Sequence, residues 1–130
     1  MSKEKITSIS FSGGGWNFVF HAGAALRLIR ENLFDEKTLF HGSSAGGPIS
    51  LAALNHIDGV VNFSDSIAIS ANMLDKVTYF NPLPFQTNMR DLAEDFVNVW
   101  LSFDKETYKR ANERLHLSIS EFPARGKIVN

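Results

Sequence analysis

The chain has 130 residues, 44% of them hydrophobic and 21% charged, so it can form one packed domain and lacks the composition of a disordered protein. Its 13 basic and 14 acidic residues give a net charge of −1, and no basic stripe runs along it, which argues against nucleic acid as a partner. It has no cysteine, which excludes disulfides and thiolate metal sites and is typical of a reducing compartment.

The stretch from Ile6 to Leu26 carries no Lys, Arg, Asp or Glu, and its composition therefore has to be tested against a membrane span. A spanning helix needs about 20 mostly apolar residues, whereas Gly13-Gly14-Gly15 and several serines interrupt this stretch. The same triplet also interrupts the apolar region that a signal peptide would need. We therefore expect a cytoplasmic protein, whose 11 phenylalanines leave room for peripheral contact with a membrane or a lipid droplet.

Strands and helices alternate over the first 55 residues. Residues 6–12 are rich in β-branched and aromatic side chains, as in a short strand. Apolar residues then recur at helical spacing, which predicts a helix over 17–32. A buried strand at 38–41 is followed by a glycine-rich turn and a helix that ends near Asn55. This alternation predicts an α/β fold with a parallel sheet and right-handed crossovers.

The second half of the chain gives weaker signals. The expected elements are a helix at 63–80, a helix at 88–103 with one apolar face, a strand at 115–120, a turn at 123–126 and a returning strand at 127–129. Because the sequence ends inside this last strand, we expect residues 1–130 to be the N-terminal part of a single domain that is incomplete at its C-terminus.

Gly42-Ser43-Ser44-Ala45-Gly46 fits the pattern Gly-x-Ser-x-Gly of a nucleophile elbow. In such an elbow the serine sits on a sharp strand-to-helix turn, and Gly42 and Gly46 let the strand and the helix pack closely. The N-terminus of the following helix directs backbone N–H groups and a positive dipole end toward developing negative charge. The pattern predicts Ser44 as the nucleophile.

Gly13, Gly14 and Gly15 follow the first predicted strand. Such a run lets the backbone turn its N–H groups outward, and the resulting nest can bind an oxyanion. A flexible turn is the simpler interpretation. Dinucleotide binding would require a third glycine at position 18, which is Phe18, and no Gly-Lys-Ser/Thr sequence supports a phosphate loop.

Taken together, Ser12-Gly13-Gly14-Gly15-Trp16, His21-Ala22-Gly23-Ala24 and the elbow motif resemble the patatin-like phospholipase family. The similarity is strongest to the branch that contains adipose triglyceride lipase and adiponutrin, which also has a strand similar to Arg114–Ser120. The resemblance implies a three-layer α/β/α fold and hydrolysis of lipid acyl esters by a Ser–Asp dyad. It implies Ser44 as nucleophile and Gly13, Gly14 and Gly15 as the oxyanion hole. No pair of histidines has metal-ligand spacing with a supporting carboxylate, so we expect no metal, and we expect no cofactor.

Two positions depart from the family pattern. Phe18 replaces a glycine that usually precedes the first helix, so it is expected to crowd the oxyanion loop. The dyad aspartate of the family lies in an Asp-Gly-Gly or Asp-Gly-Ala turn, and this sequence has none. Asp58-Gly59 follows Ser44 by one helix, about 20 Å at 1.5 Å per residue, and is interpreted as a helix-ending turn.

Three functions follow from these observations. The first is a serine acyl hydrolase whose aspartate lies beyond this chain. The alternative is a catalytically inactive protein that binds lipid or a partner through the same pocket. A third is a Ser–His–Asp hydrolase that uses His116 with Asp91, Asp95 or Asp104. The other histidines are interpreted as structural: His21 on the first helix, His41 in the core, and His56 at a helix C-terminus.

Overall fold

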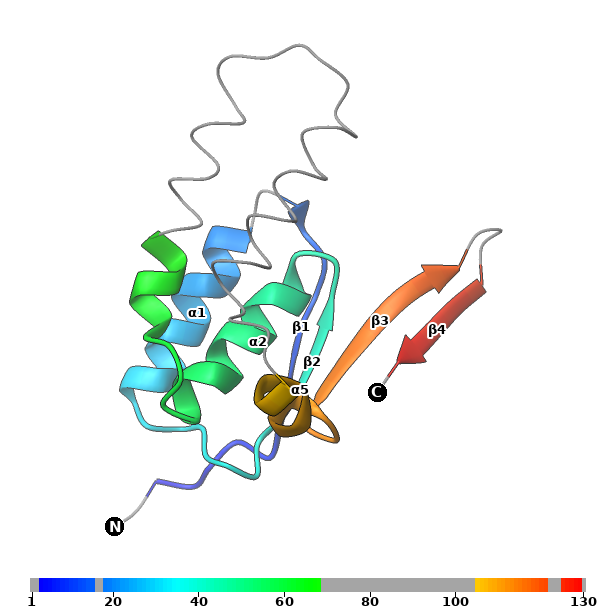
Figure 1. Ribbon diagram of the computed structural model, residues 1–130. Coiled ribbons are helices and arrows are strands. Elements are labelled where there is room, and N and C mark those ends of the chain that lie inside the picture. Colours follow the sequence, from blue (N-terminus) through cyan, green and yellow to red (C-terminus); the bar gives the residue numbers. More distant parts are fainter. Residues whose placement is uncertain (1–2, 16–17, 69–104, 122–124, 130) are drawn as a thin grey trace.

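The computed structural model describes residues 3–15, 18–68, 105–121 and 125–129. Its named elements are β1 (Ser8–Phe11), α1 (Phe18–Arg30), β2 (Leu39–Ser43), α2 (Gly46–Ile57), α5 (Lys105–Ala111), β3 (Leu115–Glu121) and β4 (Arg125–Val129). The four strands form one sheet in the order β1-β2-β3-β4, in which the first three are parallel and β4 is antiparallel to β3 (Figure 1). The predicted α/β fold is thus confirmed.

The described helices cover one face of the sheet. Helix α2 contacts β1, β2 and β3, while α1 and α5 each pack on α2 (Figure 1). Right-handed crossovers that step in one direction across a sheet place their helices on the same side, and both steps here run from β1 toward β3. A second helical layer, as in the predicted three-layer arrangement, is not seen among the described residues.

The core lies between α2 and the sheet. Phe40 of β2 is fully buried, and Phe34 meets its ring edge-on at 5.2 Å between centroids. Helix α2 is buried on nearly all sides, from Ile49 to Leu54, because it lies between the sheet and the other helices. The fully buried residues of α1 are small, Ala22 and Ala25, and its larger apolar side chains, among them Phe18 and Leu26, are partly buried against this core.

Helix α1 is terminated by Asn32, a residue in the left-handed conformation. The N–H of Leu33 bonds to the carbonyl of Leu28 at 3.0 Å, and that of Asn32 bonds to the carbonyl of Ile29 at 2.9 Å. Asn32 has φ of 54°, a conformation that asparagine tolerates better than most residues. The helix predicted over 17–32 is therefore correct to within two residues at each end.

The first strand is shorter than the expected 6–12, and β2 continues through Gly42 and Ser43, beyond the expected 38–41. Helix α5 was not predicted, because its segment is polar. Among its residues 106–111, whose burial the structure describes, only Thr107 is buried, so these residues lack the apolar stripe that marks a packed helix.

The returning strand was predicted correctly, although Arg125 and Gly126 belong to β4 and not to the turn. Residues 63–68 are helical, as expected. The remainder of that helix and the predicted helix at 88–103 lie outside the described residues. Among the described residues, no helix is long and apolar enough to cross a membrane.

Candidate active site

Ser44 stands on the turn between β2 and α2. It follows directly on the last residue of β2, its side chain is exposed, and its φ is 47°. The carbonyl of Ser44 accepts a hydrogen bond of 3.0 Å from the N–H of Gly47, which closes the turn. A left-handed conformation costs a residue with a Cβ about 1–2 kcal/mol, so the surrounding structure holds Ser44 in a strained position. This geometry is that of a nucleophile elbow.

Both glycines of the motif are sterically required. A Cβ on Gly42 would lie 2.6 Å from the Cα of Gly47 and 2.7 Å from the carbonyl oxygen of Gly46. A Cβ on Gly46 would lie 2.0 Å from the carbonyl oxygen of Phe11. These neighbours are backbone atoms and cannot swing aside. The close approach of strand and helix predicted for Gly42 and Gly46 is therefore present.

Gly13 lies beside Ser44. A Cβ on Gly13 would be 3.3 Å from the Cβ of Ser44 and 3.7 Å from the carbonyl oxygen of Ser43. The register of the sheet explains this proximity, since Phe11 at the end of β1 pairs with Gly42 just before the elbow. The chain then leaves β1 through Gly14 and through Gly15, which has φ of 51°. The glycine loop and Ser44 thus meet at the carboxyl edge of the sheet.

The side chain of Phe18 packs against the hydrophobic core and is only partly exposed. It lies in the first turn of α1, with its ring directed to the core cluster that includes Phe11 and Ala22. The side chain that replaces the family's glycine at this position thus contributes to the core.

The N-terminus of α2 is directed to the same edge. Its N-cap is Ala45, whose side chain cannot cap the helix, and no other side chain forms a cap hydrogen bond there. The first backbone N–H groups of a helix have no partner inside the helix. The N–H of Gly47 already bonds to the carbonyl of Ser44 and Pro48 has no N–H, so this end of α2 presents the N–H of Gly46 and the positive end of the helix dipole beside Ser44.

Ser50 is a positioning residue that sequence reasoning missed. Its hydroxyl is buried and lies 3.0 Å from the carbonyl oxygen of His41 and 2.9 Å from that of Gly46. It therefore connects strand β2 to the first turn of α2 on either side of Ser44. The only sequence signal is its spacing, four residues after Gly46, from which a serine can bond back to the helix backbone.

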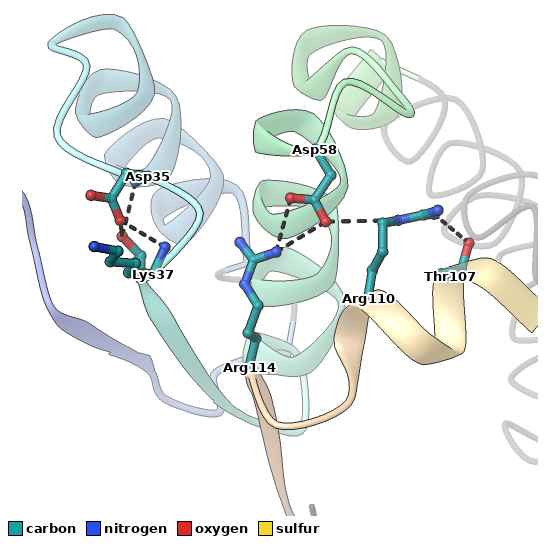
Figure 2. A network of polar contacts seen from close by, with 7 residues as sticks. Asp35, Lys37, Asp58, Thr107, Arg110 and Arg114 are labelled. Carbon is teal, nitrogen blue, oxygen red and sulfur yellow. Dashed lines mark hydrogen bonds and ion pairs between the residues drawn. The ribbon is translucent and has the colours of Figure 1, made fainter.

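Asp58 lies at the far end of α2, where it forms the C-cap, and Gly59 follows with φ of 72°. Its carboxylate binds the guanidinium of Arg114 at 2.9 and 3.1 Å and approaches Nε of Arg110 at 3.7 Å (Figure 2). Asp58 thus joins α2 to α5 and to the start of β3. The interpretation of Asp58-Gly59 as a helix-ending turn is correct.

The histidines do not gather at Ser44. The rings of His41 and His116 stack at 4.8 Å between centroids, on the sheet face opposite α2. His41 is thus half-buried on that face and not in the core, which corrects the prediction. His21 contacts the ring of Phe11 edge-on, and His56 accepts a hydrogen bond of 3.1 Å at Nδ1 from the N–H of Phe63.

Within the described part of the chain, the Ser44 hydroxyl has no hydrogen-bond partner. Asp91, Asp95 and Asp104, the acids considered for a triad with His116, lie outside that part. No group of three or more His, Asp or Glu side chains in it could hold a metal ion.

Comparison with curated proteins and with solved structures gives no significant match. The family model of the patatin-like phospholipases matches residues 9–121, a range that begins in β1 and ends with β3 and that contains both the glycine loop and the elbow. That family implies a lipid acyl hydrolase. Since the match covers most of the chain and the geometry around Ser44 agrees with it, the chain belongs to the patatin-like phospholipase family.

Proposed function

We propose that this protein is a serine acyl hydrolase that cleaves lipid esters through Ser44, within the branch that contains adipose triglyceride lipase and adiponutrin. The observation that carries the proposal is the left-handed φ of 47° at Ser44, held on the turn between β2 and α2 with Gly13 beside it. A strained, exposed serine persists only where the surrounding structure imposes it, and such positions concentrate at active sites.

The chemistry follows from this arrangement. The Oγ of Ser44 attacks the ester carbonyl carbon while its proton passes to a base. The carbonyl oxygen becomes an oxyanion, which the N–H groups of the Gly13–Gly15 loop and of the α2 N-terminus stabilise. Collapse of the intermediate expels the alcohol, which takes up the proton, and leaves an acyl-serine. Water then attacks the acyl-serine and releases the carboxylic acid.

The base is proposed to be an aspartate outside these 130 residues. Asp58 does not fit the role, because its carboxylate is engaged by Arg114 at the opposite end of α2 from Ser44. A serine hydroxyl without a base is a weak nucleophile. These 130 residues alone should therefore react slowly with esters, whereas the protein as it occurs in its cell should react at a normal rate.

Covalent labelling of the cellular protein by a fluorophosphonate tests the proposal. Peptide mapping should place the label on Ser44 and not on the neighbouring Ser43. Ser44→Ala should abolish both labelling and ester hydrolysis, while Ser64→Ala, a substitution of an exposed serine far from the elbow, should leave both intact. Hydrolysis that survives in Ser44→Ala would overturn the assignment.

The second candidate is a catalytically inactive protein that binds lipid or a partner at the same site. It is favoured by the Ser44 hydroxyl, which has no hydrogen-bond partner among the described residues, and by the engagement of Asp58 with Arg114. This candidate predicts lipid binding that Ser44→Ala leaves unchanged, and no ester turnover by the cellular protein. Turnover that disappears in Ser44→Ala would exclude it.

A further inference from the structure

Two large apolar side chains are exposed side by side in the first turn of α1. Val19 is 58% exposed and Phe20 is 77% exposed. Single exposed hydrophobic residues are common and need no explanation. Here, however, the exposed positions of the next turn, Gly23 and Ala24, are also without polar side chains. We call these four residues the α1 apolar face.

The charge on the exposed side of α1 is confined to its other end. Arg27 and Arg30 lie in the last turn, and Arg27 forms an ion pair of 2.6 Å with Glu31. The helix therefore changes along its axis from apolar to charged, over about 10 Å from Phe20 to Arg27 at 1.5 Å per residue. Such a gradient fits a helix whose first end enters an apolar phase while its last end stays in water.

The apolar end lies at the edge of the sheet that carries the nucleophile. The N-termini of α1 and α2 are both at the carboxyl ends of β1 and β2 (Figure 1). Gly13, which is beside Ser44, precedes Val19 by only six residues, so the two are at most about 20 Å apart along the chain. The α1 apolar face thus lies within about 20 Å of the glycine that flanks Ser44.

We infer that the α1 apolar face docks the protein on the surface of its lipid substrate, with Val19 and Phe20 inserted among the acyl chains. The inference rests on the proposed function, because the family fixes the substrate as a lipid ester and such esters are found in aggregates. Insertion beside the glycine loop brings Ser44 to the interface where those esters lie. Attraction to an anionic surface is not the driving force, since the chain has a net charge of −1 and Arg27 is paired with Glu31.

The test compares Val19→Ser/Phe20→Ser with Tyr108→Ser. Tyr108 on α5 is 65% exposed and serves as a matched apolar surface residue away from the active edge. Partition onto phosphatidylcholine vesicles is measured by co-flotation, with and without anionic lipid. The double substitution should lower the partition coefficient about 100-fold or more, because each buried side chain of this size contributes about 10-fold or more. Tyr108→Ser should bind as the unsubstituted protein does, and anionic lipid should change binding little.

Hydrolysis supplies a second, independent measurement. The double substitution should reduce hydrolysis of an emulsified long-chain ester but leave hydrolysis of a dissolved short-chain ester within about twofold, because Ser44 is untouched. Phe20→Leu should retain most of the binding. Unchanged vesicle partition in the double variant, or no partition of the unsubstituted protein, would overturn the inference while leaving the proposed hydrolase intact. Absence of all ester hydrolysis would overturn the hydrolase, and vesicle partition would still decide the docking.

Discussion

The backbone carbonyl oxygen of Phe11 lies 2.0 Å from the point that a Cβ atom on Gly46 would occupy. Phe11 is the last residue of β1 and is followed by the glycine loop, whereas Gly46 is the first residue of α2 and lies two residues after Ser44. The end of β1 and the start of α2 are therefore in direct contact. The absence of a side chain at position 46 is thus what allows the glycine loop and Ser44 to meet.

Gly46→Ala is expected to destabilise the protein by about 3 kcal/mol or more, since the added methyl meets backbone atoms and the strand must separate from the helix. Gly23→Ala is the matched control, because a Cβ at that exposed helical position meets nothing within 4 Å. It should stabilise the protein by about 0.5–1 kcal/mol through helix propensity. Chemical denaturation measures both, and equal effects of the two substitutions would contradict the proposed packing.

Gly13→Ala should impair catalysis more than folding. The new methyl would be 3.3 Å from the Cβ of Ser44, so either the loop or the serine must shift by a few tenths of an ångström. Small misplacements of reacting groups lower rates by up to about 100-fold. We expect a 10- to 100-fold lower rate of fluorophosphonate labelling, with a change in unfolding free energy below about 1 kcal/mol. A labelling rate equal to that of Gly23→Ala would show that the loop does not constrain Ser44.

Ser44→Gly should give a protein that is inactive but more stable. Glycine adopts φ of 47° without a penalty, so removal of the strain at this position should raise the unfolding free energy by about 1 kcal/mol. Ser44→Ala removes the same hydroxyl but keeps the Cβ, and its stability should stay near that of the unsubstituted protein. Both variants lack the hydroxyl, so a difference between their thermal unfolding midpoints reports the backbone strain alone. Identical midpoints would argue against a strained elbow.

The elbow turn at Ser44 and its glycines could be predicted because each was marked by local sequence. Gly42 and Gly46 flank Ser44 at a spacing that the close strand–helix approach requires, and the structure shows the contacts that require it. The position of Gly13 beside Ser44 is different. It depends on the parallel pairing of Phe11 with Gly42, a long-range contact that the family resemblance implied but that no local pattern encodes.

The partners of Asp58 and helix α5 could not be predicted either. The carboxylate of Asp58 binds a guanidinium that lies 56 residues later in the chain. Thr107 is the buried residue of α5, and a single buried threonine gives no periodic signal. His41 was expected in the core because it stands in an apolar run, whereas the alternation of β2 directs it to the opposite face from Phe40.

Glu31 provides a test of the contact between the N-terminal segment and α1. A hydrogen bond from Lys3, together with the charge of Arg27, holds the pKa of the Glu31 carboxyl below its ordinary value of 4.5. Because the folded pKa is the lower one, this contact stabilises the fold above about pH 4.5, and the contribution is lost as the pH falls through the folded pKa. In the variant Lys3→Met, the pKa of the Glu31 carboxyl should rise toward 4.5, and an NMR titration measures this rise. An unchanged value would mean that Lys3 is not its main partner.

The substitution Asp58→Asn tests whether the carboxylate of Asp58 has a structural or a catalytic role. The Asp58 and Arg114 side chains are only 11% and 18% exposed, so neutralising Asp58 leaves two arginines without their counter-charge between α2, α5 and β3. Loss of one partner of a largely buried pair costs about 3 kcal/mol. Glu106→Gln, which breaks the exposed pair with Lys109, should cost less than about 0.5 kcal/mol.

The activity of Asp58→Asn should be measured on the folded fraction, at a temperature well below its unfolding midpoint. Because Asp58 caps the end of α2 remote from Ser44, the rate of ester hydrolysis per folded molecule should match that of Glu106→Gln. A fall of several hundredfold without loss of folding would instead identify Asp58 as the base of the dyad. The proposal that the base lies outside these 130 residues would then be wrong.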